Sequence, residues 1–229
     1  MQRFEGQTFW HGGDPLSLSN VSASDCAFNQ CSVRSMSRDW NVLSKIQAEN
    51  IGHWNCEASG CVFDEVSLHN LKKTGSAPLF LNASVFRHVT LVGNISGLKI
   101  NRSELATLAS EEDRRWRDEE VRAFYSSTDW ALDISRAEFP NGVTFEALPG
   151  DKIVRDRETQ ALIRREALSA TDWRALDYRR TAIDIAIGWF ENGSLFDAVV
   201  VVPRSSSKYR QADAAVIEML RREGVAEPD

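Results

Sequence analysis

Apolar and polar positions follow a repeating order in the first half of the chain. Three segments, 26–33, 61–68 and 84–91, share one pattern of eight positions. The order is a small residue, any residue, Phe, two polar residues, a small or apolar residue, Ser or Thr, and an apolar residue. The second and third lie 23 residues apart, and a weaker copy covers 139–145. Strands this short cannot bury their inward side chains alone, so the period predicts that successive copies stack on one another.

Stacking of like copies places like side chains in columns. Phe28, Phe63 and Phe86 occupy the same position of the pattern, and we expect them to form one column in the core. The wider spacings on either side of the two closest copies are then taken up by insertions.

A finer step of five residues runs through the same region. Small or apolar residues recur at this step, each followed two positions later by Phe, Val or Leu, at Cys26, Cys31, Cys61 and Val66. The step resembles that of the pentapeptide-repeat family, with the best match over 21–35 and 56–73. The resemblance implies that both positions point into a square-sectioned right-handed β-helix. After Lys73 the match is lost, and the chain is more typical of a general β-helix.

We therefore predict a mainly β fold, in which residues 1–150 form a right-handed parallel β-helix (solenoid) and residues 151–229 form a C-terminal α/β cap. An inserted helix is expected at about 103–125, where Ser110 and Asp113 have the spacing of a helix-capping pattern. A β-sandwich with repetitive strands is the alternative fold.

Within the cap, a buried strand is expected at 198–202, and helices are expected at 156–169, 172–191 and 208–223. Gly224 is placed to end the last helix. Three tryptophans are expected in the core of this part, namely Trp130, Trp173 and Trp189.

Charge and composition restrict the partners. The net charge of −6 argues against nucleic acid, because phosphate recognition needs a basic surface. The first ten residues lack the basic and apolar regions of a signal peptide, and no apolar stretch is long enough to span a membrane. We expect a cytoplasmic protein with reduced thiols and with no nucleic-acid or membrane partner.

The cysteines form two pairs with four residues between their members, Cys26/Cys31 and Cys56/Cys61. Zinc sites favour closer pairs such as C-x₂-C. The five-residue step explains all four as small core residues, and we expect neither a metal nor a cofactor.

Charged residues of adjacent copies also align. Arg87 corresponds to Asp64 and His88 to Glu65, which predicts opposite charges stacked on the solvent-exposed side.

Two other groups of polar residues are candidates for catalysis or for anion binding. Asp129, Asp133 and Glu138 cluster near one predicted strand, and paired carboxylates would suit a carbohydrate-active enzyme. The loop 203–208 contains Arg204 and Lys208 before a predicted helix, and such a loop can hold an anion, although solvated charges are the simpler explanation.

Without a recognisable catalytic motif, the leading hypothesis is a non-catalytic protein-binding module. The resemblance to pentapeptide-type β-helices implies a protective role against bacterial toxins, in the form of an immunity protein that binds and neutralises a cognate bacterial toxin. An acidic protein of this kind suits a basic partner. The alternatives are a carbohydrate-active β-helix enzyme and a structural scaffold subunit.

The inserted helix is the candidate contact surface. It carries Arg114, Arg115, Trp116, Arg117 and Asp118 in succession, and Arg and Trp are the residue types most often found as interface hot spots. The competing explanation is that Trp116 attaches the helix to the side of the β-structure and that neighbouring acids pair with the arginines.

Overall fold

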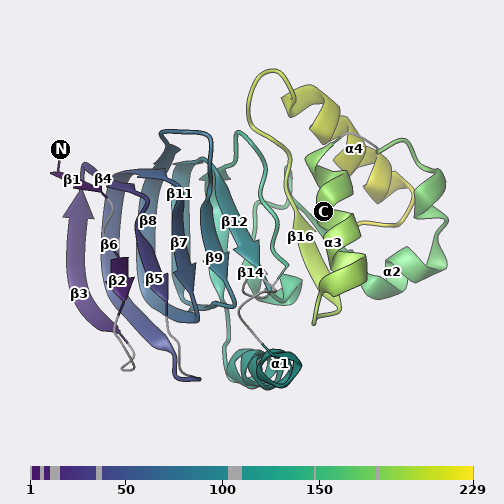
Figure 1. Cartoon of the computed structure of the whole chain (residues 1–229). Helices are drawn as coiled ribbons and strands as arrows, with labels where there is room; N and C mark the ends of the chain where they lie inside the picture. The colour runs from purple at the N-terminus through teal and green to yellow at the C-terminus, as the bar shows by residue number, and fades with distance from the viewer. Residues whose placement is uncertain are drawn as a thin grey trace.

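The computed structural model describes most of the chain. Described are residues 2–5, 8–10, 16–34, 38–102, 110–146, 148–178 and 181–228. Within them the fold is mainly β, with parallel sheets in the N-terminal part and a smaller helical part at the C-terminal end (Figure 1). None of the described helices has both the length and the apolar character needed to cross a membrane.

The parallel part consists of a nine-stranded and a five-stranded sheet. The nine strands are β1 (Gln2–Glu5), β3 (Ser17–Ser24), β4 (Cys26–Asn29), β6 (Asn41–Trp54), β8 (Cys61–Lys73), β10 (Val85–Arg87), β11 (Val89–Ile95), β13 (Leu132–Glu138) and β14 (Ile153–Val154). The five are β2 (Thr8–Trp10), β5 (Ser32–Arg34), β7 (Cys56–Ser59), β9 (Leu79–Asn82) and β12 (Leu98–Asn101). The chain passes alternately from one sheet to the other, and the strand pairs described within both sheets are parallel.

We call one pass of the chain through both sheets a rung. Four successive rungs span 17–34, 41–59, 61–82 and 85–101. Equivalent strands pair in register, so that Leu43 lies beside Phe63 and Phe63 beside Phe86. The alignment of Phe63 with Phe86 in the sequence is therefore confirmed.

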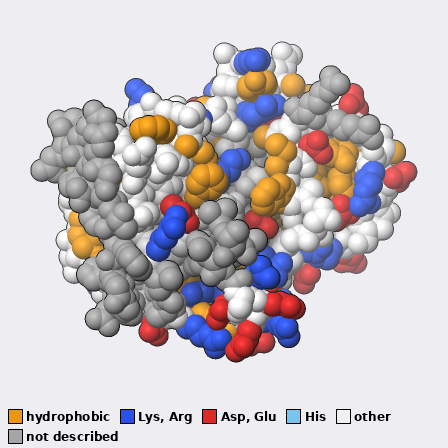
Figure 2. Space-filling model, in the orientation of Figure 1, with side chains coloured by type: hydrophobic (Ala, Val, Ile, Leu, Met, Phe, Trp, Pro, Cys, Tyr) orange, Lys and Arg blue, Asp and Glu red, His pale blue; other side chains and the backbone are white. Residues whose placement is uncertain are grey.

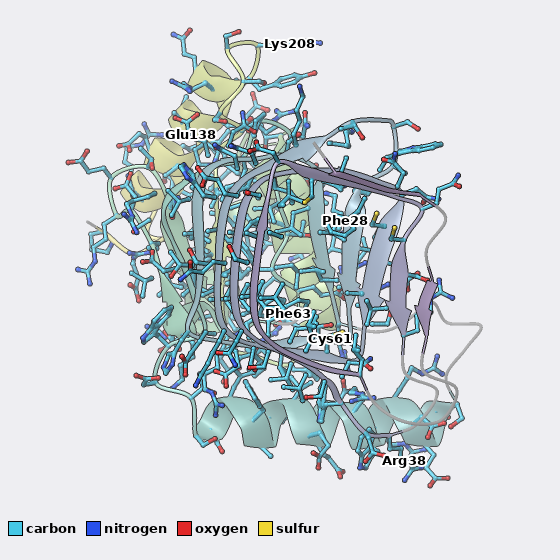
Figure 3. All side chains as sticks on the ribbon, turned by 90° about the vertical axis from the view of Figure 1, so that its left-hand side faces the viewer. Phe28, Arg38, Cys61, Phe63, Glu138 and Lys208 are labelled. Carbon is cyan, nitrogen blue, oxygen red and sulfur yellow. The ribbon has the colours of Figure 1, made fainter. Side chains whose placement is uncertain are left out.

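The placement of Phe28 in the same column is wrong. Phe28 pairs with His53, and His53 pairs with Lys73, ten residues beyond Phe63. Figure 3 looks down the stack of rungs and shows Phe28 and Phe63 at separate places around the strands. Because every side of a rung repeats the same pattern, the sequence alignment is out of phase by two five-residue steps.

Bends in the backbone explain the five-residue step. Among the described residues, ten other than glycine have φ between 47° and 60°, most of them five apart, at Asn20, Asp25, Gln30, Lys45, Asn50, Asn55, Glu65, Asn70, Ala83 and His88. Asn and Asp tolerate this left-handed conformation better than most residues. At one bend their side chains form a ladder, in which Asn70 Nδ2 donates to Asn50 Oδ1 at 3.1 Å and Asn50 Nδ2 donates to Asp25 Oδ1 at 3.3 Å.

Two hydrophobic clusters meet at the antiparallel pair of strands β15 (Ala161–Arg164) and β16 (Ala198–Val201). Leu162 and Val200 belong to the cluster inside the rungs, whereas Ile163 belongs to the cluster among the C-terminal helices. The β15–β16 pair therefore covers the C-terminal end of the first core and forms one wall of the second.

The helix expected over 156–169 is wrong for most of its length. Only α2 (Arg165–Ala170) is helical, and residues 161–164 form β15. Ala161, Leu162 and Ile163 are all buried. A strand between two cores buries successive side chains on opposite sides, which an amphipathic helix cannot do.

The remaining helices are α1 (Glu111–Ser126), α3 (Ala182–Gly193) and α4 (Arg210–Arg222). The capping pattern is confirmed, because the Ser110 side chain accepts a hydrogen bond from the Asp113 backbone N–H. Gly224 follows α4 with a φ of 72° and confirms the expected end of that helix. The helix expected from 172 begins later: Trp173–Ala175 form a 3-10 turn, and α3 starts after its cap residue Thr181.

Candidate protein-binding surface

The inserted helix α1 lies outside the sheets, along one side of the rungs (Figures 1 and 3). Its inner side is fixed by Val121 and Tyr125, which are both buried. The Tyr125 hydroxyl accepts a hydrogen bond from the Phe86 backbone N–H at 3.2 Å, and burial raises the pKa of this phenol. The N-terminal part of the expected insertion, 103–109, lies outside the described residues.

Two of the five predicted contact residues are in a stack of cations and indoles. The Arg117 guanidinium lies 4.2 Å from the Trp40 ring centroid and 4.6 Å from that of Trp116. Arg38 also contacts Trp116, at 5.5 Å, and donates hydrogen bonds to Glu112 and Asp113 at the start of α1. These contacts join α1 to the segment that precedes β6.

The other three predicted residues differ in exposure. Asp118 accepts two hydrogen bonds from Arg102, one of them 3.0 Å long from Nε. Arg114 and Arg115 are exposed, and Arg115 forms an ion pair with Glu111 one turn away at 3.1 Å. Internal packing thus accounts for Trp116, Arg117 and Asp118, while the two exposed arginines remain accessible to a partner.

The candidate carboxylates are separated and individually bonded. Asp129 accepts from His88 Nε2 at 2.7 Å, which lowers the pKa of Asp129. Asp133 accepts from the Ser135 backbone N–H and hydroxyl, and Glu138 lies 3.7 Å from Arg210. The structure does not bring these three acids together in one site.

The predicted stacking of opposite charges holds for one of the two pairs. Arg87 Nε donates to Asp64 Oδ1 at 2.8 Å, and this bond lowers the pKa of Asp64. His88 contacts Asp129, not the Glu65 that the sequence alignment places beside it.

All four cysteines, Cys26, Cys31, Cys56 and Cys61, are buried and form no disulfide. Their prediction as core residues is confirmed. Burial raises the pKa of the Cys56 thiol, which keeps it protonated. Among the described residues, no group of three His, Cys, Asp or Glu side chains is arranged to hold a metal ion.

The cations of the 203–208 loop are engaged within the protein. Arg204 donates to both carboxylate oxygens of Asp213, which is fully buried. Lys208 lies 4.9 Å from the Tyr209 ring centroid. The ion pair with Asp213 explains the presence of Arg204 in this loop, with no need for a bound anion.

An exposed apolar pair on α3 escaped the sequence analysis. Ile185 and Trp189, one helical turn apart, are 52% and 47% exposed. A Cβ on the intervening Gly188 would meet no atom within 4 Å. The expected burial is confirmed for Trp173 but wrong for Trp189. The helical period contained the signal, since Ile185 and Trp189 lie opposite the core-facing residues of the same helix.

Other parts of the surface are mixed in character. Hydrophobic side chains are interspersed with charged ones over the C-terminal part on the face shown in Figure 2. A shallow depression crosses β3, β6, β8 and β11, and its lining is of mixed polar and apolar character; it consists of Asn20, Val21, Ser22, Lys45, Ile46, Gln47, Glu65, Val66, Ser67, His88, Thr90 and Trp130. It forms a broad open surface, unlike an enclosed ligand cavity.

Comparison with protein-family models, with curated proteins and with solved structures finds no match to this chain.

Proposed function

We propose that the rungs form a right-handed parallel β-helix and that the chain functions by binding another protein. The parallel register, the alternation between two sheets and the left-handed bends every five residues support the β-helix. Connections between parallel strands of one sheet are almost always right-handed, which supports the handedness.

The exposed pair on α3, Ile185 and Trp189, is the main support for the proposed protein binding. Burying a large apolar side chain gains about 1.5–3 kcal/mol, so the exposure of two such side chains side by side forgoes stabilisation that packing would provide. Trp is also the residue most enriched among interface hot spots. In contact with a partner protein, Ile185 and Trp189 gain an apolar environment that the rest of this chain does not provide.

The specific role that we propose is an immunity protein that binds and neutralises a cognate bacterial toxin. The net charge of −6 favours a basic partner, because complementary charge speeds association and orients docking. The exposed Arg114 and Arg115 of α1 form a second proposed contact. A carbohydrate-active enzyme is less well supported, because its candidate acids Asp129, Asp133 and Glu138 are apart and bonded to other side chains.

Affinity capture with the full chain, followed by affinity measurement on the captured protein, tests this proposal. We expect Trp189→Ala and Ile185→Ala each to weaken binding about tenfold or more, as is usual for hot spots. Val154→Ala is the matched control, because Val154 is apolar and 43% exposed but lies in β14. In the toxin role, co-expression of the native chain relieves toxicity of the captured protein.

Equal affinity of the native chain and both α3 variants, with unchanged melting, would remove α3 from the interface. A captured protein whose toxicity the chain leaves unaltered would contradict the immunity role while leaving protein binding intact.

A further inference from the structure

The two ends of the parallel sheets differ in what covers them. At the C-terminal end, residues of the antiparallel β15–β16 pair belong to the same core cluster as the inward residues of the rungs. At the N-terminal end, β1, β2 and β3 each pair with a later strand on one edge, and no described strand pairs with the other edge. Figure 1 shows these three strands together at the end remote from the helices of the C-terminal part.

The apolar core continues to this N-terminal end. Leu18 pairs with Leu43, Leu43 with Phe63, and Phe63 with Phe86, so the four side chains form one inward column. Exposure is 39% at Leu18, 8% at Leu43 and 2% at Phe86. Leu18 is thus at the end of a core column, and no described strand covers its outer side.

The sequence of β3 lacks the usual protection of an edge strand. Proteins commonly place charged residues, proline or a bulge on exposed edges to prevent further pairing. The strand Ser17–Ser24 contains none of these residue types and pairs with β6 without an irregularity in register. Its apolar residues Leu18, Val21 and Ala23 occupy the inward positions, with Ser19, Asn20 and Ser22 between them.

We propose that this N-terminal end docks on the same end of a second copy of the chain. An isologous contact needs a surface that is complementary to itself. The uncharged β3 meets this condition, because a two-fold arrangement brings no like charges of this strand together. The apolar end of the Leu18 column would then meet the same column of the second copy, and backbone groups at the free edge of β3 would find partners. This proposal is independent of partner binding through α3.

The backbone contacts of Leu16 identify which groups face the free edge. The Leu16 carbonyl accepts from the Val42 N–H, and the Leu16 N–H donates to Asn41 Oδ1. Both groups therefore point toward β6. Since backbone groups of successive strand residues point to opposite sides, the N–H groups of Ser17 and Ser19 point to the free edge.

The mass of the full chain in solution, measured by light scattering after gel filtration over a wide concentration range, tests the proposal. We expect the native chain to dimerise. Leu18→Glu should weaken self-association by about tenfold or more, because it places two unpaired carboxylates in the interface. Val154→Glu, an exposed apolar position in β14 near the other end of the sheet order, should dimerise like the native chain.

Ser19→Pro provides a second variant that removes an edge N–H without adding charge, and it should also favour the monomer. Thermal melts at concentrations where the native chain is monomeric check that each variant folds. A native chain that stays monomeric at every concentration would overturn the proposal. So would a dimer that survives both β3 substitutions in folded variants.

Discussion

The ring of Phe63 lies nearly parallel to the ring of Phe86, with centroids 5.3 Å apart and planes inclined by 10°. The two residues face each other in register across β8 and β10, strands of successive rungs. Because the rings extend the inward column that begins at Leu18, they link the stacking of rungs to the packing of the core.

The two rings should differ in their contribution to stability. Phe86 is 2% exposed, whereas Phe63 is only partly buried. We expect Phe86→Ala to lower the free energy of unfolding by about 3–5 kcal/mol, the usual range for a buried Phe. Phe63→Ala should cost less, since solvent already reaches part of its ring. Urea melts of the two variants measure the difference, and a larger loss at Phe63 would contradict the order of burial.

The sequence predicted the step of the repeat but not its phase. A five-residue step follows from bends that need left-handed backbone, and residues such as Asn20, Asp25 and Asn50 accept that conformation. The phase depends on which side of a rung each copy occupies. Since the sides share one pattern, nothing local separates Phe28 from Phe63, and only the long-range pairing of Phe28 with His53 does so.

At β15, pairing with the distant strand β16 also outweighs the helix preference of the local sequence. Residues 156–169 are rich in good helix formers, yet Ala161 pairs with Val201 because the two-stranded β15–β16 sheet lies between two cores. Local signals succeeded where the contact itself is local, as at the Ser110 cap of α1. The role of Arg117 could not be predicted, because its partner Trp40 is distant in the sequence.

Stability should depend on pH through His53, which is 2% exposed. Its Nε2 lies 2.8 Å from the Ser96 carbonyl oxygen, and burial, with a smaller effect from Lys73, lowers its pKa below the ordinary 6.5. Below pH 6.5 the unfolded chain therefore binds a proton that the folded chain resists. This contribution is complete above pH 6.5 and is lost as the pH falls through the folded-state pKa.

Urea melts on both sides of pH 6.5 test this dependence. The free energy of unfolding of the native chain should fall more steeply with acidification than that of His53→Gln, which keeps a donor for Ser96 but does not titrate. His69→Gln is the control, because the His69 side chain is 49% exposed. Equal slopes for the native chain and His53→Gln would show that His53 is protonated equally in both states.

The last prediction separates attachment of α1 from recognition by α1. Arg117 lies between Trp40 and Trp116, so Arg117→Ala removes two cation–π contacts and the packing of the side-chain stem. At about 0.5–1 kcal/mol for each contact, we expect a loss of about 1–2 kcal/mol in the free energy of unfolding. Tryptophan fluorescence during urea melts reports both stability and the environment of the indoles.

Arg115→Ala is the matched control on the same helix. The Arg115 side chain is 72% exposed and its ion pair with Glu111 is solvated, so the change should stay within about 0.5 kcal/mol. Equal effects of the two substitutions would mean that the stack contributes no stability. If the predicted difference is found, charge reversal of Arg114 and Arg115 with Arg117 left intact tests whether the exposed side of α1 contacts the partner, because the helix then keeps its attachment to the rungs.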